Sequence, residues 1–147
     1  MGRLLKLVYS EASLRGDLLK LLRNPRTLPN FVVLRHEDQF ESGHPDFSVT
    51  GNHITSWFEI KYLRPSDSDI RSRGIQDFTL LRLGCVSKHV FYIIYDNRKN
   101  NPITRIIHAT QVAKWKEDGA GVTAVGFNHM FVVEFIRGHH GSDKHDW

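Results

Sequence analysis

The amino-acid sequence predicts an α/β domain with a mixed central sheet. Segments with apolar residues every three or four positions alternate with short runs of β-branched and aromatic residues. Their order is α-β-β-β-α-β, followed by a β-α-β extension. This alternation favours a layered fold, because each helix can cover one face of the sheet.

The first half of the chain contains a helix, a strand and a hairpin. In the predicted helix 10–23, Leu14, Leu18 and Leu22 follow a period of 3.6 residues, and Asn24-Pro25 ends it. A strand is predicted at 31–34. Two more, 47–49 and 54–63, flank a turn at Gly51-Asn52 and form a hairpin.

The second half begins with a polar connection, 64–74, and a helix, 75–84, that Gly84 closes as a left-handed cap. The apolar run 90–96 is typical of a central strand. A strand at 103–108, a short helix over 109–119 and a last strand at 129–138 complete the expectation. The 147 residues predict one domain over 1–138, and the polar tail 139–147 is expected to be disordered.

The hairpin separates apolar from charged residues. A turn centred on Gly51-Asn52 places Asp46 opposite Trp57 and diagonal to Glu59, with the two acids about 7–8 Å apart between backbones. Period-two alternation then gives an apolar face with Phe47, Val49, Ile54, Phe58 and Ile60, and a second face with Asp46, Trp57, Glu59 and Lys61.

Two neighbouring carboxylates and a lysine indicate a divalent metal site. Mg²⁺ takes oxygen ligands from a few carboxylates and leaves its other positions to water and phosphate. Lys61 would then orient the attacking water or offset charge on phosphate. The alternative is a solvated polar stripe in which Lys61 only pairs with an acid. Glu11 lies on the apolar stripe of the first helix and either joins this site or stays in solvent near the helix N-terminus.

The motifs resemble those of a known nuclease family. Gly43-His44-Pro45-Asp46, then Glu59-Ile60-Lys61, then Gln76 at the start of a helix are similar to the PD-(D/E)-x-K nuclease superfamily. The closest likeness is to the virus-type replication-repair nucleases (VRR-Nuc) and the archaeal-type Holliday junction resolvases, over about residues 8–96. The resemblance implies a restriction-endonuclease-like αβββαβ core, Mg²⁺ or Mn²⁺ as cofactor, and hydrolysis of DNA phosphodiesters.

The resemblance also implies a role for each matching residue. Asp46 and Glu59 correspond to metal ligands, Ile60 to a ligand through its backbone carbonyl, and Lys61 to the catalytic lysine. Gln76 corresponds to a glutamine that supports the catalytic site, and Glu11 to the acid of the first helix, a role that Glu37 or Glu41 could also fill.

Charge suggests where DNA would bind. The net charge of +4 favours polyanionic partners, and we expect phosphate contacts from four cations near the motif: Arg64, Arg71, Arg73 and Lys88. A solvated loop is the alternative, because Asp67 and Asp69 lie in the same stretch. The only cysteine, Cys85, is expected to be buried and reduced, and no apolar run is long enough to span a membrane.

Together these features predict a cytoplasmic, metal-dependent DNA endonuclease of bacterial or viral origin, with branched or junction DNA as one candidate substrate. Action on a four-way junction would require a homodimer with two sites. The rival hypothesis is a non-catalytic nucleic-acid-binding or assembly module on the same fold.

Overall fold

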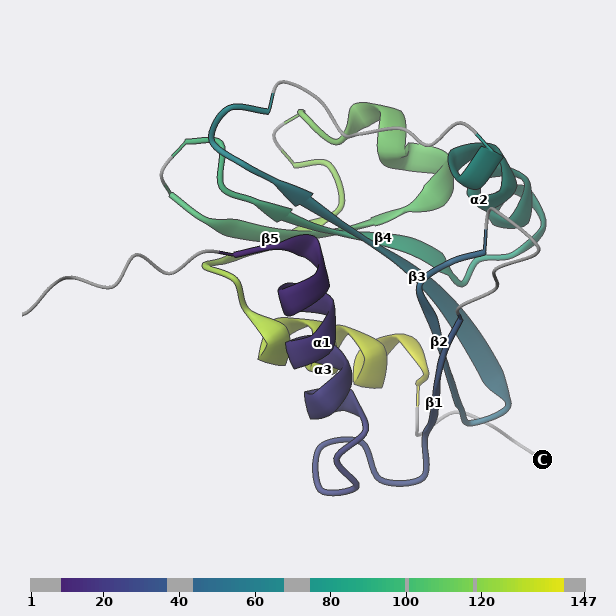
Figure 1. Cartoon of the computed structure of the whole chain (residues 1–147). Coiled ribbons are helices and arrows are strands. Elements are labelled where there is room, and N and C mark those ends of the chain that lie inside the picture. Colours follow the sequence, from purple (N-terminus) through teal and green to yellow (C-terminus); the bar gives the residue numbers. More distant parts are fainter. Residues whose placement is uncertain (1–8, 37–43, 68–74, 100, 118, 142–147) are drawn as a thin grey trace, which may run out of the picture.

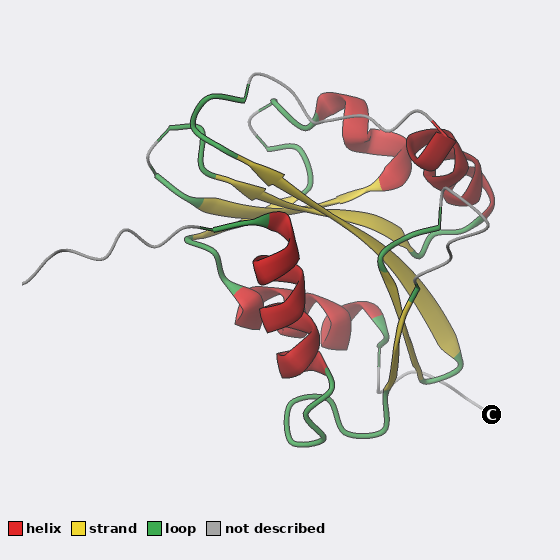
Figure 2. Cartoon of the chain, viewed as in Figure 1, coloured by secondary structure: helices red, strands yellow, loops and turns green. Residues whose placement is uncertain are grey.

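A six-stranded sheet lies between two layers of helices (Figure 1). The computed structural model describes residues 9–36, 44–67, 75–99, 101–117 and 119–141. Helices α1 (Glu11–Leu22) and α3 (His129–His139) cover one face of the sheet, and α2 (Ile75–Val86) and the 3₁₀ helix η1 (Ala109–Lys114) cover the other (Figure 2). The predicted α/β class is confirmed.

The sheet is mixed, as predicted. Its strands follow one another in space as they do in sequence: β1 (Val32–Arg35), β2 (Phe47–Gly51), β3 (Ile54–Leu63), β4 (Val90–Asp96), β5 (Ile103–His108) and β6 (Val122–Val125). Only β3 and β4 pair in parallel, and the other neighbouring strands are antiparallel. The helix α2 makes the crossover that a parallel pair requires.

Helix α1 begins and packs as its sequence predicts. The Ser10 hydroxyl accepts a hydrogen bond from the Ser13 amide at 3.0 Å, and the Ser13 hydroxyl bonds the Ser10 backbone in return. This reciprocal cap satisfies amides that no helical carbonyl can reach. The leucines at positions 14, 18 and 22 are buried against the sheet, so the predicted apolar stripe holds the helix in place.

Alternation along β4 divides the core in two. Phe91, Ile93 and Tyr95 face α1 and α3, whereas Val90, Tyr92 and Ile94 face α2 and η1. Every residue of β4 is buried, as expected of a central strand covered on both faces.

The segment 129–138, predicted to be a strand, is helix α3. Its β-branched and aromatic residues suggested a strand, but Val132, Val133 and Ile136 are buried at helical spacing. Asn128 caps the helix, because its side-chain oxygen accepts a hydrogen bond from the Phe131 amide at 2.9 Å. Packing against the sheet therefore outweighs the local strand preference.

The helix continues into the segment predicted to be a disordered tail. His139 is its last residue, and the next residue, His140, is completely buried. The His140 ring bonds the Gly51 carbonyl oxygen at 2.9 Å and also the Ser56 hydroxyl. These bonds attach the end of α3 to the β2–β3 hairpin. Residues 142–147 lie outside the described part of the chain.

Three smaller expectations were wrong. Gly84 does not close α2 but lies within it, where an added Cβ would approach the Ala109 Cβ to 3.0 Å. The glycine therefore lets η1 pack closely against α2. Cys85 is exposed rather than buried. The short edge strand β6 was missed because its residues are mostly exposed and form no apolar run. Within the described residues, no helix is long and apolar enough to cross a bilayer.

Candidate active site

The β2–β3 hairpin places Asp46 beside Glu59. Phe47 pairs with Phe58, so Asp46, one residue before β2, lies directly opposite Glu59 rather than opposite Trp57. The turn residues are Asn52 and His53, both with positive φ, one position later than predicted. A one-residue displacement of the turn changes the register by two and leaves the faces unchanged. The predicted polar face is therefore retained, with the two acids closer than expected.

Four polar contacts fix Asp46 in place. Its carboxylate accepts hydrogen bonds from the Ile60 amide at 2.8 Å and from Arg15 at 3.3 Å. Its backbone carbonyl accepts from the His36 amide at 2.9 Å, and its backbone amide donates to Glu59 Oε1 at 3.2 Å. Both the backbone and the side chain are thus held between β1, β3 and α1.

Glu59 and Lys61 lie close together, both buried, on the same face of β3. Their side chains are 3% and 6% exposed, and Lys61 Nζ lies 3.6 Å from Glu59 Oε2. Burial, with the nearby carboxylates of Asp46 and Glu11, raises the pKa of Glu59 to about 9, although Lys61 acts in the opposite direction. The local environment therefore has too little positive charge to keep Glu59 ionised at neutral pH.

Glu11 approaches the same region from α1. Its Oε1 accepts a hydrogen bond from the Tyr62 amide at 3.3 Å, and its charge contributes to the raised pKa of Glu59. Among the described residues, no three acidic, histidine or cysteine side chains already surround a single point. Glu37 and Glu41, the alternatives to Glu11, lie outside the described residues.

Arg15 is a site residue that the sequence reasoning missed. It follows Glu11 by four positions, so both side chains lie on one face of α1, and its guanidinium reaches Asp46. The i, i+4 spacing was the signal that would have found it. Arg15 orients the Asp46 carboxylate and partly offsets its charge.

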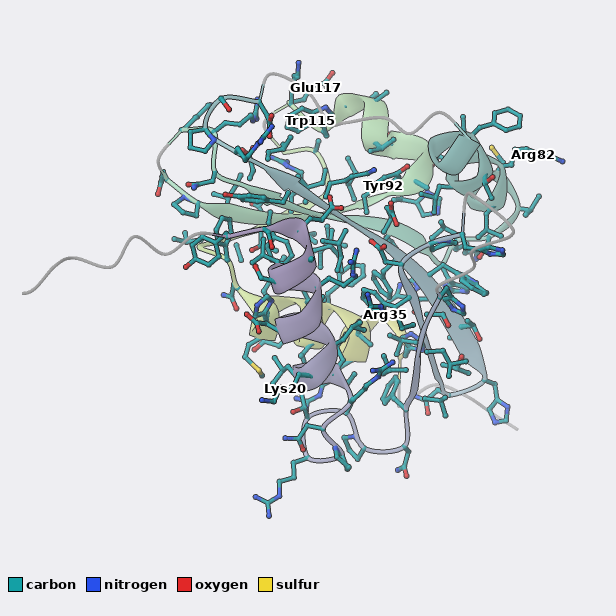
Figure 3. The ribbon with its side chains drawn as sticks, viewed as in Figure 1. Lys20, Arg35, Arg82, Tyr92, Trp115 and Glu117 are labelled. Atoms are coloured by element: carbon teal, nitrogen blue, oxygen red, sulfur yellow. The ribbon has the colours of Figure 1, made fainter. Side chains whose placement is uncertain are left out.

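Ile60 and Gln76 are two further predicted site residues. Ile60, which lies between Glu59 and Lys61 in sequence, is buried, and its amide donates a hydrogen bond to Asp46. A role for its carbonyl as a metal ligand stays a prediction. Gln76 lies in the first turn of α2, but its side chain lies outside what the structure describes. Tyr92, the β4 partner of Glu59, lies near the middle of the sheet (Figure 3).

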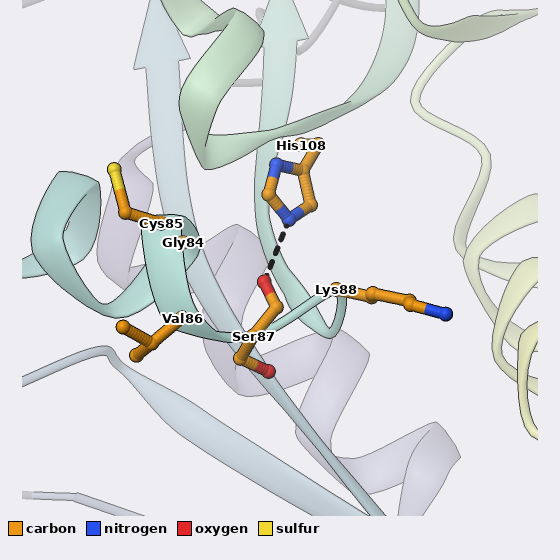
Figure 4. A pocket seen from close by; sticks show the side chains of 6 residues that line it. All are labelled: Gly84, Cys85, Val86, Ser87, Lys88 and His108. Atoms are coloured by element: carbon orange, nitrogen blue, oxygen red, sulfur yellow. Dashed lines mark hydrogen bonds between the residues drawn. The ribbon is translucent and has the colours of Figure 1, made fainter.

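Of the four predicted DNA-contacting residues, the structure describes Arg64 and Lys88. Arg64 binds Asp67 through both its side chain and its amide, which is the local ion pair of a turn. Lys88 precedes β4, four residues before Tyr92, and borders a cavity of about 380 Å³ with Ser87 and His108 (Figure 4). The ammonium group of Lys88 points away from Ser87 and His108 (Figure 4). Arg71 and Arg73 lie outside the described residues.

Comparison of the chain with protein-family models and with curated proteins finds no match.

Proposed function

We propose that this protein is a metal-dependent DNA endonuclease of the PD-(D/E)-x-K type. The observation that carries the proposal is the juxtaposition of Asp46 with the buried Glu59–Lys61 pair across one hairpin. The order of the first six elements, α-β-β-β-α-β, supports it, because the motif resemblance implies a restriction-endonuclease-like core with that order. Structure-selective cleavage of branched DNA belongs to the same proposal.

The acids have the chemistry that Mg²⁺ or Mn²⁺ requires. Both ions prefer oxygen ligands, and a divalent cation beside Glu59 would favour its ionised form and so lower its raised pKa. Asp46 and Glu59 would hold the ion, with Glu11 and the Ile60 carbonyl as further ligands. When bound, the ion stabilises negative charge that develops on the phosphate.

The protein groups around the acids would position the reactants. Arg15 and the Ile60 amide each bind one oxygen of the Asp46 carboxylate and so hold it in a single orientation. Lys61, held by Glu59, presents a fixed positive charge to a phosphate oxygen or to the attacking water. Water adds to phosphorus, the bond to one deoxyribose oxygen breaks, and a phosphate monoester and a hydroxyl end result.

Cleavage of a DNA panel by the protein and its Lys61→Met variant tests this function. Duplex, single-stranded, branched and four-way-junction DNAs are incubated with Mg²⁺, with Mn²⁺ or with EDTA, and the product ends are mapped. We expect metal-dependent cleavage, reduced about 10²–10³-fold in the variant, because a preorganised charge at the reacting phosphate is lost.

Glu134→Gln is the matched control, since Glu134 is an exposed carboxylate on α3, and it should cleave as the wild type does. Circular dichroism of each variant verifies that the fold is retained. Equal cleavage by wild type and Lys61→Met would refute the assignment. Tight DNA binding by the wild type without cleavage of any substrate would favour a non-catalytic binding module.

A further inference from the structure

A second charged cavity lies at the end of β4, beyond the residues of the candidate active site. It has a volume of about 220 Å³ and is bordered by Asp96, Arg98, Lys99, Asn101, Ile103, Arg105 and Lys116. Among these described residues, four side chains are cationic and one is a carboxylate. The cavity therefore carries an excess of positive charge, which favours an anionic ligand.

Arg105 is the buried member of this group. The residue is only 7% exposed, and one of its guanidinium nitrogens donates to the Ala120 carbonyl oxygen. Its Nε has no hydrogen-bond partner among the described residues. A buried donor without a partner costs free energy, and a charged one costs more, so the position suggests a missing acceptor.

The carboxylate of Asp96 is bound by Arg98 and does not accept a hydrogen bond from Arg105 Nε. Arg98 donates to Asp96 Oδ1 at 3.0 Å and to Oδ2 at 2.8 Å. These bonds and the charges of Arg98 and Arg105 lower the pKa of Asp96, although burial alone would raise it. The charge of Arg98 is thus balanced by Asp96, and the excess positive charge comes from Lys99, Arg105 and Lys116.

The wall of the cavity is ordered by an aromatic ring. The Arg98 guanidinium lies 4.3 Å from the centre of the Trp115 ring, and Lys116 Nζ lies 5.5 Å from it. Trp115 is 4% exposed and belongs to the core beneath α2 and η1, on the opposite side of the sheet from Lys20 of α1 (Figure 3). Side chains held in this way lose little entropy when an anion binds.

The cavity and the candidate active site share one face of the sheet. Lys61 pairs with Ile94, and Ile94 pairs with Arg105, so all three stand in one row across β3, β4 and β5. Two strand spacings separate Lys61 from Arg105, about 10 Å between backbones. The cavity therefore lies close to the candidate active site, across a row whose middle residue, Ile94, is buried.

We propose that this cavity binds a phosphate group and that, in the substrate complex, this is a backbone phosphate of the DNA next to the cleaved bond. The assignment to DNA rests on the proposed function. Phosphate oxygens match the planar guanidinium of Arg105 and the ammonium groups of Lys99 and Lys116. The same chemistry would accept inorganic phosphate or the phosphates of a free nucleotide, so the experiment distinguishes these sources.

Binding of labelled duplex and single-stranded DNA in EDTA tests the proposal without requiring cleavage. One variant is the double substitution Lys99→Gln/Lys116→Gln, at two exposed positions. The other is Arg105→Lys, which keeps the positive charge but loses the planar guanidinium group. We expect each to weaken DNA binding about tenfold, as loss of a charge-assisted hydrogen bond does. The double variant should also reduce the slope of log affinity against log salt by about 1–2.

Arg26→Gln is the control, because Arg26 is exposed in the turn after α1. It should change DNA affinity much less than the cavity variants. Competition with inorganic phosphate and ADP identifies the source of the phosphate. If the variants lose millimolar binding of phosphate or ADP but bind DNA as the wild type does, the cavity is a site for small phosphates. Unchanged binding of DNA, phosphate and ADP in the variants would overturn the proposal, whether or not the protein cleaves DNA.

Discussion

Glu59 is a buried side chain whose proposed role as a metal ligand has a cost in stability. Its carboxyl group is 3% exposed and adjoins the carboxylate of Asp46, so its pKa rises to about 9. In the absence of a metal the folded protein therefore keeps a proton on Glu59 at pH 7, whereas the unfolded chain releases it. A divalent cation would displace this proton, and metal binding should strengthen as pH rises.

The first prediction concerns Glu59→Gln in the absence of metal. Between pH 4.5 and pH 9 the folded wild type binds one more proton than the unfolded chain, so its free energy of unfolding falls as pH rises. The variant lacks this dependence. Above about pH 4.5 the free energy of unfolding of Glu59→Gln should rise relative to that of the wild type by up to about 1.4 kcal/mol per pH unit, and below pH 4 the difference should no longer depend on pH.

Urea unfolding in EDTA at pH 5 and pH 8 measures this difference. His139, whose pKa burial lowers to about 4, contributes the opposite slope below pH 6.5, but equally in both proteins. The comparison therefore isolates Glu59. Parallel pH profiles for wild type and variant would show that the Glu59 pKa is not raised.

At this scale the sequence predicted the shared face of three polar residues better than their spacing. Alternation along the hairpin places Asp46, Glu59 and Lys61 on one face for any two-residue turn. Their exact register depended on the turn, and His53 was not expected to adopt positive φ. Arg15 was missed because its contact with Asp46 joins two elements whose docking angle no local pattern specifies.

Among the elements, helix α3 was the least predictable. Residues 129–138 combine a high strand propensity with a helical burial pattern, and the choice between them is made by the sheet face on which they pack. The strand β6 was missed for the opposite reason. It lies at an edge and buries little, so hydrogen bonds to β5 define it rather than apolar residues. Helix α1 and strand β4, whose patterns are unambiguous, were predicted correctly.

Two glycines, one within α1 and one directly before β6, give opposite predictions for stability. Gly16 lies within α1 with nothing within 4 Å of an added Cβ, so Gly16→Ala should stabilise the protein by about 0.5–1 kcal/mol. Gly121 has a φ of +66°, and a Cβ there would lie 2.3 Å from the Ile106 carbonyl oxygen. Gly121→Ala should therefore destabilise by about 1–3 kcal/mol.

Thermal and urea unfolding of the two variants measures both effects. Because the same substitution is made twice, the opposite signs separate backbone conformation from the general effect of adding a methyl group. A destabilising Gly16→Ala would contradict the open helical position assigned to residue 16.

In the whole molecule, the two layers of helices have different tasks. Helices α1 and α3 support the hairpin, through Arg15 on Asp46 and through His140 on Gly51. The opposite face of the sheet presents Lys61 and, two strands away, Arg105. The sheet thus holds a candidate catalytic group and a candidate phosphate site in one row, on the side that α2 and η1 cover.

Metal binding should appear in the stability of the whole domain. A ligand that binds only the folded state raises the free energy of unfolding by about 2.7 kcal/mol at roughly 100 times its Kd. We expect Mn²⁺ to raise the Tm of the wild type and of Glu134→Gln, and to have little effect on Asp46→Asn/Glu59→Gln. An equal rise in all three proteins would place the Mn²⁺ site elsewhere.

The most direct test of the central claim is the single-turnover rate of DNA cleavage by wild type and by Asp46→Asn with saturating Mn²⁺. Asp46→Asn is nearly isosteric, so the hairpin and its contact with the Ile60 amide should persist while one anionic metal ligand is lost. The account predicts metal-dependent cleavage by the wild type and a loss of at least about 10²-fold in the variant. Cleavage at the same rate by both proteins would contradict it.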